Sequence, residues 1–376
     1  MHQSGVSHRF KALDVFRGIT ICFMIIVNTP GSWEYVYSPL DHAVWNGFTP
    51  TDLVFPSFLF AVGNAMSFVI PKWEEKGNLY VIKKVLKRTA LLFLIGYLVY
   101  WFPFFRLDSQ HHIQSFPISE TRIPGVLQRI ALAYGAASLL LHFFKKRQVL
   151  YACIFILLAY WGILYFFRNP ADPYSIHGNV VLKIDTWFFG INHLYHGEGF
   201  PFDPEGVLST LPSIVNVVAG FFAGYYLQKK GKGYEGLFKL ILAGFICFVI
   251  AWWWNLILPI NKKIWTSSYV MLTVGLDCMI LAAIVYALDI KQKKWGVYFF
   301  DVFGRNPLFI YLLSELAVII LVMIPVQGTN FLDWVYAHIF SKTGNYFGSF
   351  LFAVCFMLCC WFVGYLLHKK KIYIRI

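Results

Sequence analysis

The stretch Asp41-His-Ala-Val-Trp-Asn-Gly-Phe-Thr-Pro-Thr-Asp-Leu-Val-Phe-Pro56 joins two strongly apolar segments, residues 15–27 and 53–70. It sets a histidine, two aspartates, a Trp-Asn-Gly turn and two prolines beside runs apolar enough to enter a membrane. Polar groups at a membrane edge are costly to desolvate, and those found there usually serve a function. His42 is therefore the first candidate for chemistry among the eleven histidines.

The composition outside this stretch is that of an integral membrane protein. Of the 376 residues, 58% are hydrophobic and 19% aromatic, and the mean hydropathy is +0.60, whereas a soluble domain is nearer half apolar. All seven cysteines lie in apolar runs, which argues against a disulfide framework and against zinc. The first apolar run reads as a retained span rather than a removable signal peptide.

Runs of about 20 mostly apolar residues predict about ten transmembrane helices. The predicted spans are 12–30, 51–71, 87–105, 124–144, 149–168, 207–228, 236–258, 265–288, 304–325 and 347–367. No separate soluble domain is apparent. The expected fold is therefore an all-α, polytopic helical bundle, with residues 1–376 forming a single transmembrane domain surrounded by lipid.

The basic residues give this bundle an orientation. Of the 32 Lys and Arg residues, 23 fall in connections on one side, 7 fall on the other, and Arg17 and Arg129 lie within spans. Basic loops stay in the cytoplasm, so both termini are expected there, in a multi-pass protein of the cell inner membrane. The net charge of +13 is thus a topology signal, and we expect no nucleic-acid partner.

This orientation places the His42 loop outside, together with the two longest connections, residues 106–123 and 169–206. Long ordered loops often carry function, and the second of these is rich in turn residues, carboxylates and aromatics. Such loops can roof a pocket for a sugar-like substrate. The candidate substrate-binding residues are Trp45, Asn46, Asp203 and Glu205.

His42 and Asn28 are the candidates for catalysis. A histidine can accept a proton at neutral pH or act as a nucleophile. Because side chains adjacent in sequence rarely face each other, Asp52 or Glu205, rather than Asp41, is expected to orient His42. Asn28 ends the first span, where a buried amide must find a partner. It can cap the broken helix or donate to a developing oxyanion.

Charged groups inside the predicted spans are candidates for binding an anionic cofactor. Asp14 and Arg17 are three residues apart and share a helix face, which suits either a structural ion pair or an anion site. Arg129 and its neighbour Gln128 can hold a phosphate or carboxylate if they face inward. The alternative for a span arginine is that it reaches the membrane surface, which suits Arg122 better.

A metal site is not expected. His193 and His196 are spaced as neighbours on a helix turn with Glu198 nearby, but a third ligand at diagnostic spacing is missing. The sequence also lacks the Gly-x-Ser-x-Gly, phosphate-loop and dinucleotide-binding motifs.

Six blocks in the same order resemble the heparan-alpha-glucosaminide N-acetyltransferase family of transmembrane acyltransferases, in its shorter bacterial branch. The blocks are Leu13-Asp-x-x-Arg-Gly, Met24-Ile-x-x-Asn, His42-Ala-x-Trp-Asn-Gly-x-Thr-x-x-Asp-Leu-Val-Phe-Pro, Arg122-Ile-Pro-Gly-Val-Leu-Gln-Arg, Phe202-Asp-Pro-Glu-Gly-Val-Leu-Ser-Thr and Pro259-x-Asn-Lys-x-x-Trp-Thr-x-Ser-Tyr. They extend over nearly the whole chain, which makes the match specific.

The resemblance implies transfer of acetyl from cytoplasmic acetyl-CoA, the cosubstrate, to the amine of a glucosamine-like sugar or glycan on the far side of the membrane. The family's active-site histidine falls on His42 and its motif asparagine on Asn28. Direct attack by the acceptor and a route through acetyl-histidine both remain open. The competing function is transport of a sugar or organic anion, since about ten spans with internal charges also suit a transporter. The sequence leaves open whether the protein forms a homodimer.

Overall fold

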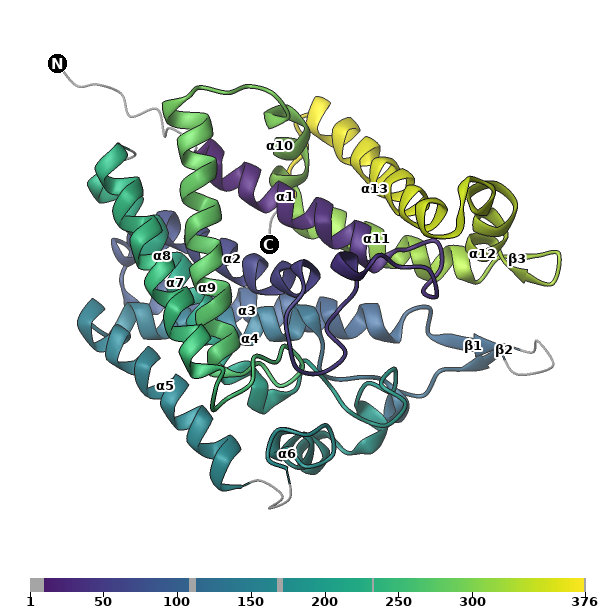
Figure 1. Cartoon of the computed structure of the whole chain (residues 1–376), viewed down its shortest axis with the longest axis horizontal. Helices are drawn as coiled ribbons and strands as arrows, with labels where there is room; N and C mark the ends of the chain where they lie inside the picture. Colours follow the sequence, from purple (N-terminus) through teal and green to yellow (C-terminus); the bar gives the residue numbers. More distant parts are fainter. Residues whose placement is uncertain (1–9, 108–112, 168–171, 232, 375–376) are drawn as a thin grey trace.

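Figure 1 shows the computed structural model of the chain, which describes residues 10–107, 113–167, 172–231 and 233–374. Most of these residues are helical, because long apolar runs satisfy their backbone hydrogen bonds within one helix. The α-helices are α1 (Lys11–Asn28), α2 (Val54–Glu74), α3 (Asn78–Trp101), α4 (Val126–Phe143), α5 (Lys146–Phe166), α6 (Val180–Phe189), α7 (Val207–Lys230), α8 (Tyr234–Trp254), α9 (Ser267–Val285), α10 (Val297–Arg305), α11 (Pro307–Val322), α12 (Phe331–Val335) and α13 (Asn345–Lys369).

Two short antiparallel hairpins depart from the predicted all-helical fold. Both lie in connections between helices. They pair β1 (Phe105–Leu107) with β2 (Ile113–Ser115), and β3 (Pro325–Val326) with β4 (Thr329–Asn330). The short helix α6, in the connection that follows α5, also has no counterpart among the predicted spans. Some residues used in the sequence analysis lie outside the described residues. They are residues 169–171 of that connection and four of the basic residues counted for the orientation: Arg9, Arg168, Lys232 and Arg375.

In the described ranges, seven helices are long and apolar enough to cross a membrane, or eight if a bent pair counts as one span. The predicted spans 12–30 and 87–105, which correspond to α1 and the second half of α3, are not among them. α1 carries Lys11, Asp14 and Arg17, and α3 carries four basic residues in its first half. The helical membrane protein is thus confirmed, whereas the count of ten and the side of the termini stay predictions.

The bent pair is α10 and α11, whose axes turn by 82° at Asn306. The single predicted span 304–325 is therefore wrong in its shape, since it starts in the last turn of α10. Pro307 begins α11, and the residue before a proline is disfavoured in a helix, so the chain turns there. The buried Asn306 side chain ties this corner to the C-terminal segment through its bonds with Ile372 and Ile374.

Glycines bring pairs of helices into backbone contact. A side chain at Gly63 of α2 would overlap the backbone of α7, and one at Gly220 of α7 would overlap the backbone of α2. α1 and α10 approach each other in the same way at Gly18 and Gly304. Close packing through small residues is a main source of helix association in a membrane, where lipid removes the hydrophobic driving force.

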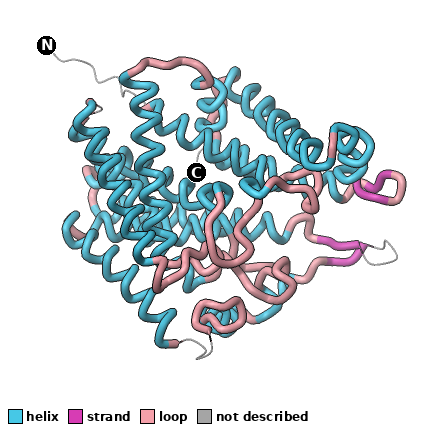
Figure 2. Tube along the Cα trace, viewed as in Figure 1, coloured by secondary structure: helices cyan, strands magenta, loops and turns pink. Residues whose placement is uncertain are grey.

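Most of the long connections gather in one region of the bundle. Figure 2 shows them as pink segments on the side of the hairpins, away from the N-terminus. The His42 loop, the connection from α5 through α6 to α7, and the turn between α8 and α9 meet there, as their hydrogen bonds show. The C-terminal end of α1 opens toward the same region, which brings polar side chains from distant parts of the sequence together.

Candidate functional site

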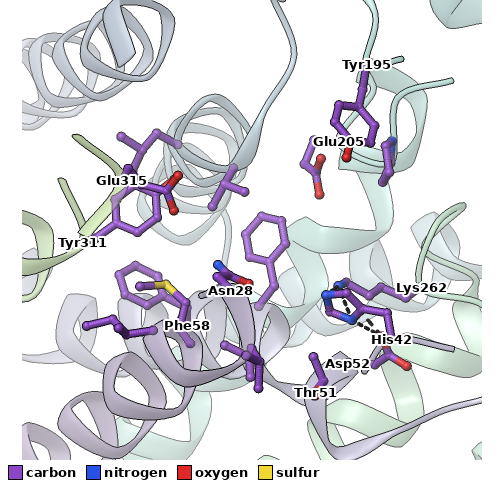
Figure 3. Close-up of a pocket in the computed structure, with 18 of the residues that line it drawn as sticks. Asn28, His42, Thr51, Asp52, Phe58, Tyr195, Glu205, Lys262, Tyr311 and Glu315 are labelled. Atoms are coloured by element: carbon purple, nitrogen blue, oxygen red, sulfur yellow. Dashed lines mark hydrogen bonds and ion pairs between the residues drawn. The ribbon is translucent and has the colours of Figure 1, made fainter. Parts of the chain in front are cut away.

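A cavity of ≈ 410 Å³ lies where these loops meet α1, α2, α4 and α11. Its volume is in the range of small-molecule sites. Figure 3 shows His42, Asp52 and Lys262 on one side, Glu315 and Tyr311 on the other, and Asn28 between them. Apolar side chains, among them Phe55, Phe58 and Val318, complete the wall.

The start of α2 positions Asp52. Thr49 is the N-cap of a short 3-10 turn, Pro50 occupies its first position, and Asp52 its third, which is a capping box. One carboxylate oxygen of Asp52, Oδ2, accepts the backbone N–H groups of Thr49 at 3.0 Å and Ala43 at 3.2 Å. The other oxygen is left to face the cavity. The cap residues thus place a buried carboxylate at a defined point.

The second carboxylate oxygen of Asp52, Oδ1, contacts the ring of His42. Nδ1 of His42 lies 2.7 Å from Oδ1 of Asp52, whereas the carboxylate of Asp41 accepts the backbone N–H of His42 rather than its ring. Of the two expected orienting partners, Asp52 makes the contact and Glu205 does not. When the N–H of Nδ1 donates to this carboxylate, Nε2 is the ring nitrogen that carries the lone pair.

Lys262 places a positive charge beside this pair. Its Nζ lies 3.0 and 3.1 Å from the two ring nitrogens of His42 and 3.8 Å from Oδ1 of Asp52. Burial lowers the pKa of Lys262, an effect that the nearby charges of Asp52 and Glu205 offset only in part. His42, Asp52 and Lys262 thus form one polar cluster at the wall of the cavity.

Arg122 organises a second part of the cavity wall. It makes two hydrogen bonds to Asp203, at 2.7 and 2.8 Å, and one of 2.6 Å to Glu205. The guanidinium also lies between the rings of Tyr100 and Tyr195, 4.8 and 4.7 Å from their centroids. Burial raises the pKa of Glu205, but the positive charges of Arg122 and of the other basic side chains nearby lower it by more. The pKa of Glu205 therefore lies below its ordinary value. Glu205 lines the cavity, and Asp203 is buried behind it.

Asn28 corrects one expectation. Its side chain is exposed to the cavity rather than buried, because α1 ends at this residue and the chain turns away at Thr29. Its amide makes no hydrogen bond within the part of the chain that the structure describes. It neither caps the helix nor holds a loop, so it is free to contact a ligand.

Trp45 and Asn46 hold the His42 loop in place rather than line the cavity. The indole N–H of Trp45 donates to the carbonyl of Tyr174 at 2.6 Å, and its ring packs against Phe202. The amide oxygen of Asn46 accepts from Asn261 at 3.1 Å. These contacts connect three loops, which fixes the position of His42. Substrate contacts by the two residues stay predictions.

Asp14 and Arg17 form the expected ion pair on α1, away from the cavity. Arg129 is 0% exposed; it donates to the carbonyl of Pro204 and the hydroxyl of Ser209, and its guanidinium lies over Trp265. A phosphate could reach Arg129 only if the packing around its buried guanidinium opened. Its neighbour Gln128 is buried as well, and none of the four lines the described cavity.

Histidines 193 and 196 do not assemble a metal site. Nδ1 of His193 is within 2.6 Å of the carbonyl of Thr121, and Glu198 pairs with Lys263 at 2.5 Å instead of turning toward the histidines. No group of three metal-binding side chains occurs in the ranges that the structure describes.

Several cavity residues were not predicted as site residues. Lys262, Lys263 and Glu315 are among them. Glu315 lies in the middle of α11, where a charged residue among leucines and isoleucines is itself a signal of function. Tyr195 belongs to the aromatic-rich connection that was predicted to roof a pocket, and it does line the cavity.

Comparison with known proteins supports one family for the whole arrangement. Residues 9–250 match the model of the heparan-alpha-glucosaminide N-acetyltransferase catalytic family. The mouse heparan-alpha-glucosaminide N-acetyltransferase is 27% identical over 98% of this chain and 61% of its own length, and the human enzyme is 27% identical over 83% of this chain and 53% of its own length. The chain thus spans little more than half the length of these relatives. The family match includes Asn28, His42, Asp52, Arg122 and Glu205, and on that evidence the chain belongs to the heparan-alpha-glucosaminide N-acetyltransferase catalytic family.

Proposed function

We propose that the protein is a membrane acetyltransferase that moves an acetyl group from acetyl-CoA to the amine of a glucosamine-like sugar or glycan. The observation that carries the proposal is the bond between His42 and Asp52 at the wall of a cavity, in a chain of this family. The donor is proposed to come from the cytoplasm and the acceptor from the other side of the inner membrane, as the basic loops suggest.

The cavity fits the acyl end of the donor better than its nucleotide end. Its apolar wall, which includes Phe55 and Phe58, suits a flexible thioester arm. Phosphates would need free cations, but Arg122 and Lys263 are paired with carboxylates, and Lys262 lies against His42 and Asp52. The nucleotide is therefore proposed to stay outside this cavity, on the cytoplasmic side.

His42 is proposed to act as the base. With its Nδ1–H donated to Asp52, Nε2 can take a proton as the amine attacks the thioester carbon and the C–S bond breaks. The same proton can then pass to the departing sulfur, which leaves as a thiol. In the two-step route Nε2 attacks the thioester carbon first, the C–S bond breaks and the thiolate leaves. The amine then attacks the acetyl group on the imidazole, and the bond from its carbon to Nε2 breaks. Asn28 is proposed to donate its free amide N–H to the oxyanion in either route.

The test is incubation of the protein in nanodiscs with labelled acetyl-CoA and a panel of amino sugars. Label appearing on the amine of one sugar supports the proposal. Proteoliposomes with acetyl-CoA on one side and acceptor on the other test the sidedness. If sugar crosses the bilayer without consumption of acetyl-CoA, the protein is a transporter and the proposal is wrong.

A further inference from the structure

The cavity contains an amine of the protein's own, Nζ of Lys262. It lies 3.1 Å from Nε2 of His42 and 3.0 Å from Nδ1. Figure 3 shows the lysine side chain, which comes from the turn between α8 and α9, with its amine beside the ring. In the proposed reaction an acceptor amine has to lie within hydrogen-bond distance of Nε2, so that the imidazole can take its proton. The amine of Lys262 therefore lies where the reaction requires an acceptor amine.

The surroundings of Lys262 favour a reactive amine. Oδ1 of Asp52 lies 3.8 Å from Nζ, which is beyond hydrogen-bond distance, and the same oxygen already contacts His42. Burial lowers the pKa of Lys262, and the charges of Asp52 and Glu205 offset this effect only in part. A lowered pKa increases the share of the neutral amine at neutral pH, and the neutral amine is the nucleophilic form.

The next residue in the chain, Lys263, provides a comparison within the same cavity. The side chains of Lys262 and Lys263 are each 17% exposed, and both line the cavity wall. Nζ of Lys263, however, donates to the carboxylate of Glu198 at 2.5 Å. The two lysines thus differ in their partners and not in their exposure. A reaction that depends on His42 should distinguish them, whereas chemical acetylation from solution should not.

We propose that Lys262 is a site of self-acetylation, whose amine accepts the acetyl group of acetyl-CoA when no sugar acceptor occupies the cavity. This inference rests on the proposed function, which brings the thioester to His42. The bond between Nζ and the thioester carbon forms as the C–S bond breaks. Nε2 of His42 takes the proton from Nζ and passes it to the departing sulfur. The products are an amide on Lys262 and the free thiol of CoA.

The experiment measures acetylation of the protein itself. Purified protein in nanodiscs is incubated with labelled acetyl-CoA and no sugar, denatured, and treated with hydroxylamine, which removes acetyl from an imidazole but not from a lysine amide. Peptide mass spectrometry then measures the acetyl on each lysine. In wild type and Lys263→Arg we expect label on Lys262, and in Lys262→Arg no label at that position. Lys262 should be labelled about tenfold or more faster than Lys263, and His42→Ala should slow its labelling by about 10²-fold or more.

Absence of label on Lys262, or equal labelling of Lys262 and Lys263, would overturn the inference, and both results come from the wild-type protein alone. Labelling of Lys262 in His42→Ala at the wild-type rate would overturn it as well, because the reaction would then be chemical acetylation from solution. Transfer to the panel of amino sugars is measured on the same preparation. Transfer without label on Lys262 refutes self-acetylation alone. Label on Lys262 without transfer to any sugar refutes the proposed function and leaves the modification site standing.

Discussion

Nδ1 of His42 lies 2.7 Å from Oδ1 of Asp52, and the other oxygen of the same carboxylate caps the turn that starts α2. One side chain thus both caps the turn at the start of α2 and orients the histidine of the preceding loop. This dual use explains how a loop holds an imidazole at a fixed angle, because the ring is bound to the turn that starts a helix.

Replacing Asp52 by Asn tests this dual use. The amide oxygen is expected to keep the bonds to the backbone of Thr49 and Ala43, so the NH₂ group would face Nδ1 of His42. That arrangement moves the ring proton to Nε2, where a base needs a lone pair. We expect kcat to fall by about 10²–10⁴-fold with little change in the KM for acetyl-CoA.

Asp41→Asn is the matched control, because the carboxylate of Asp41 accepts the backbone N–H of His42 rather than its ring, and an amide oxygen can replace it. Steady-state kinetics should show at most a few-fold change for this variant. Equal losses of kcat in the two variants would mean that Asp52 supports the loop and not the chemistry.

The variant His42→Ala should bind acetyl-CoA normally and transfer nothing measurable. The ring is needed to move the proton, whereas the donor is expected to bind along the apolar wall. Equilibrium binding and turnover are measured on the same preparation. His196→Ala, at an exposed histidine of another loop, should retain full activity. Turnover by His42→Ala would remove this residue from the mechanism.

Gly63→Ala should destabilise the bundle by about 1–3 kcal/mol or more. The added methyl group would overlap the backbone carbonyl of Val217 and push α2 away from α7. Gly162→Ala in α5 is the control, because a methyl group there meets only ordinary contacts and alanine favours the helix. In thermal unfolding in detergent, the midpoint temperature should be lower for Gly63→Ala than for wild type. For Gly162→Ala it should be unchanged or higher. Equal midpoints would show that the two helices tolerate separation.

Stability should depend on pH through Asp185, in the loop helix α6. Burial raises the pKa of Asp185 to about 7, although N–H groups of Leu208 and Val207 at the start of α7 stabilise its charge. Between its ordinary pKa of 3.8 and about 7 the folded protein therefore binds more protons at this site than the unfolded chain, so stability falls as the pH rises through that range.

Asp185→Asn removes this titration and keeps the oxygen that accepts from Val207. The difference in unfolding midpoint between wild type and Asp185→Asn should shift in favour of the variant as the pH rises from about 5 to about 8. Midpoints measured at intervals across this range provide the check. A difference that stays constant over the range would contradict a raised pKa at this residue.

The motif around His42 was readable in the sequence because its residues act locally. Thr49, Pro50 and Asp52 form a cap through spacing that is visible in one dimension. The same holds for the Asp14–Arg17 pair, which the helix period brings together. The partners from other loops were not readable, since Lys262 reaches His42 across 220 positions of the chain.

The sequence by itself determined the helical membrane fold and the identity of the polar loop, because hydrophobic run length and local capping depend only on neighbouring residues. The tertiary structure decided which polar residues share the cavity. It brought Glu315 and Lys262 to the cavity and left Arg129 and Gln128 buried away from it. Helix packing at glycines and the corner at Asn306 set those positions. Such contacts join segments that are distant in the sequence, and their sequence separation does not predict that they are close in space.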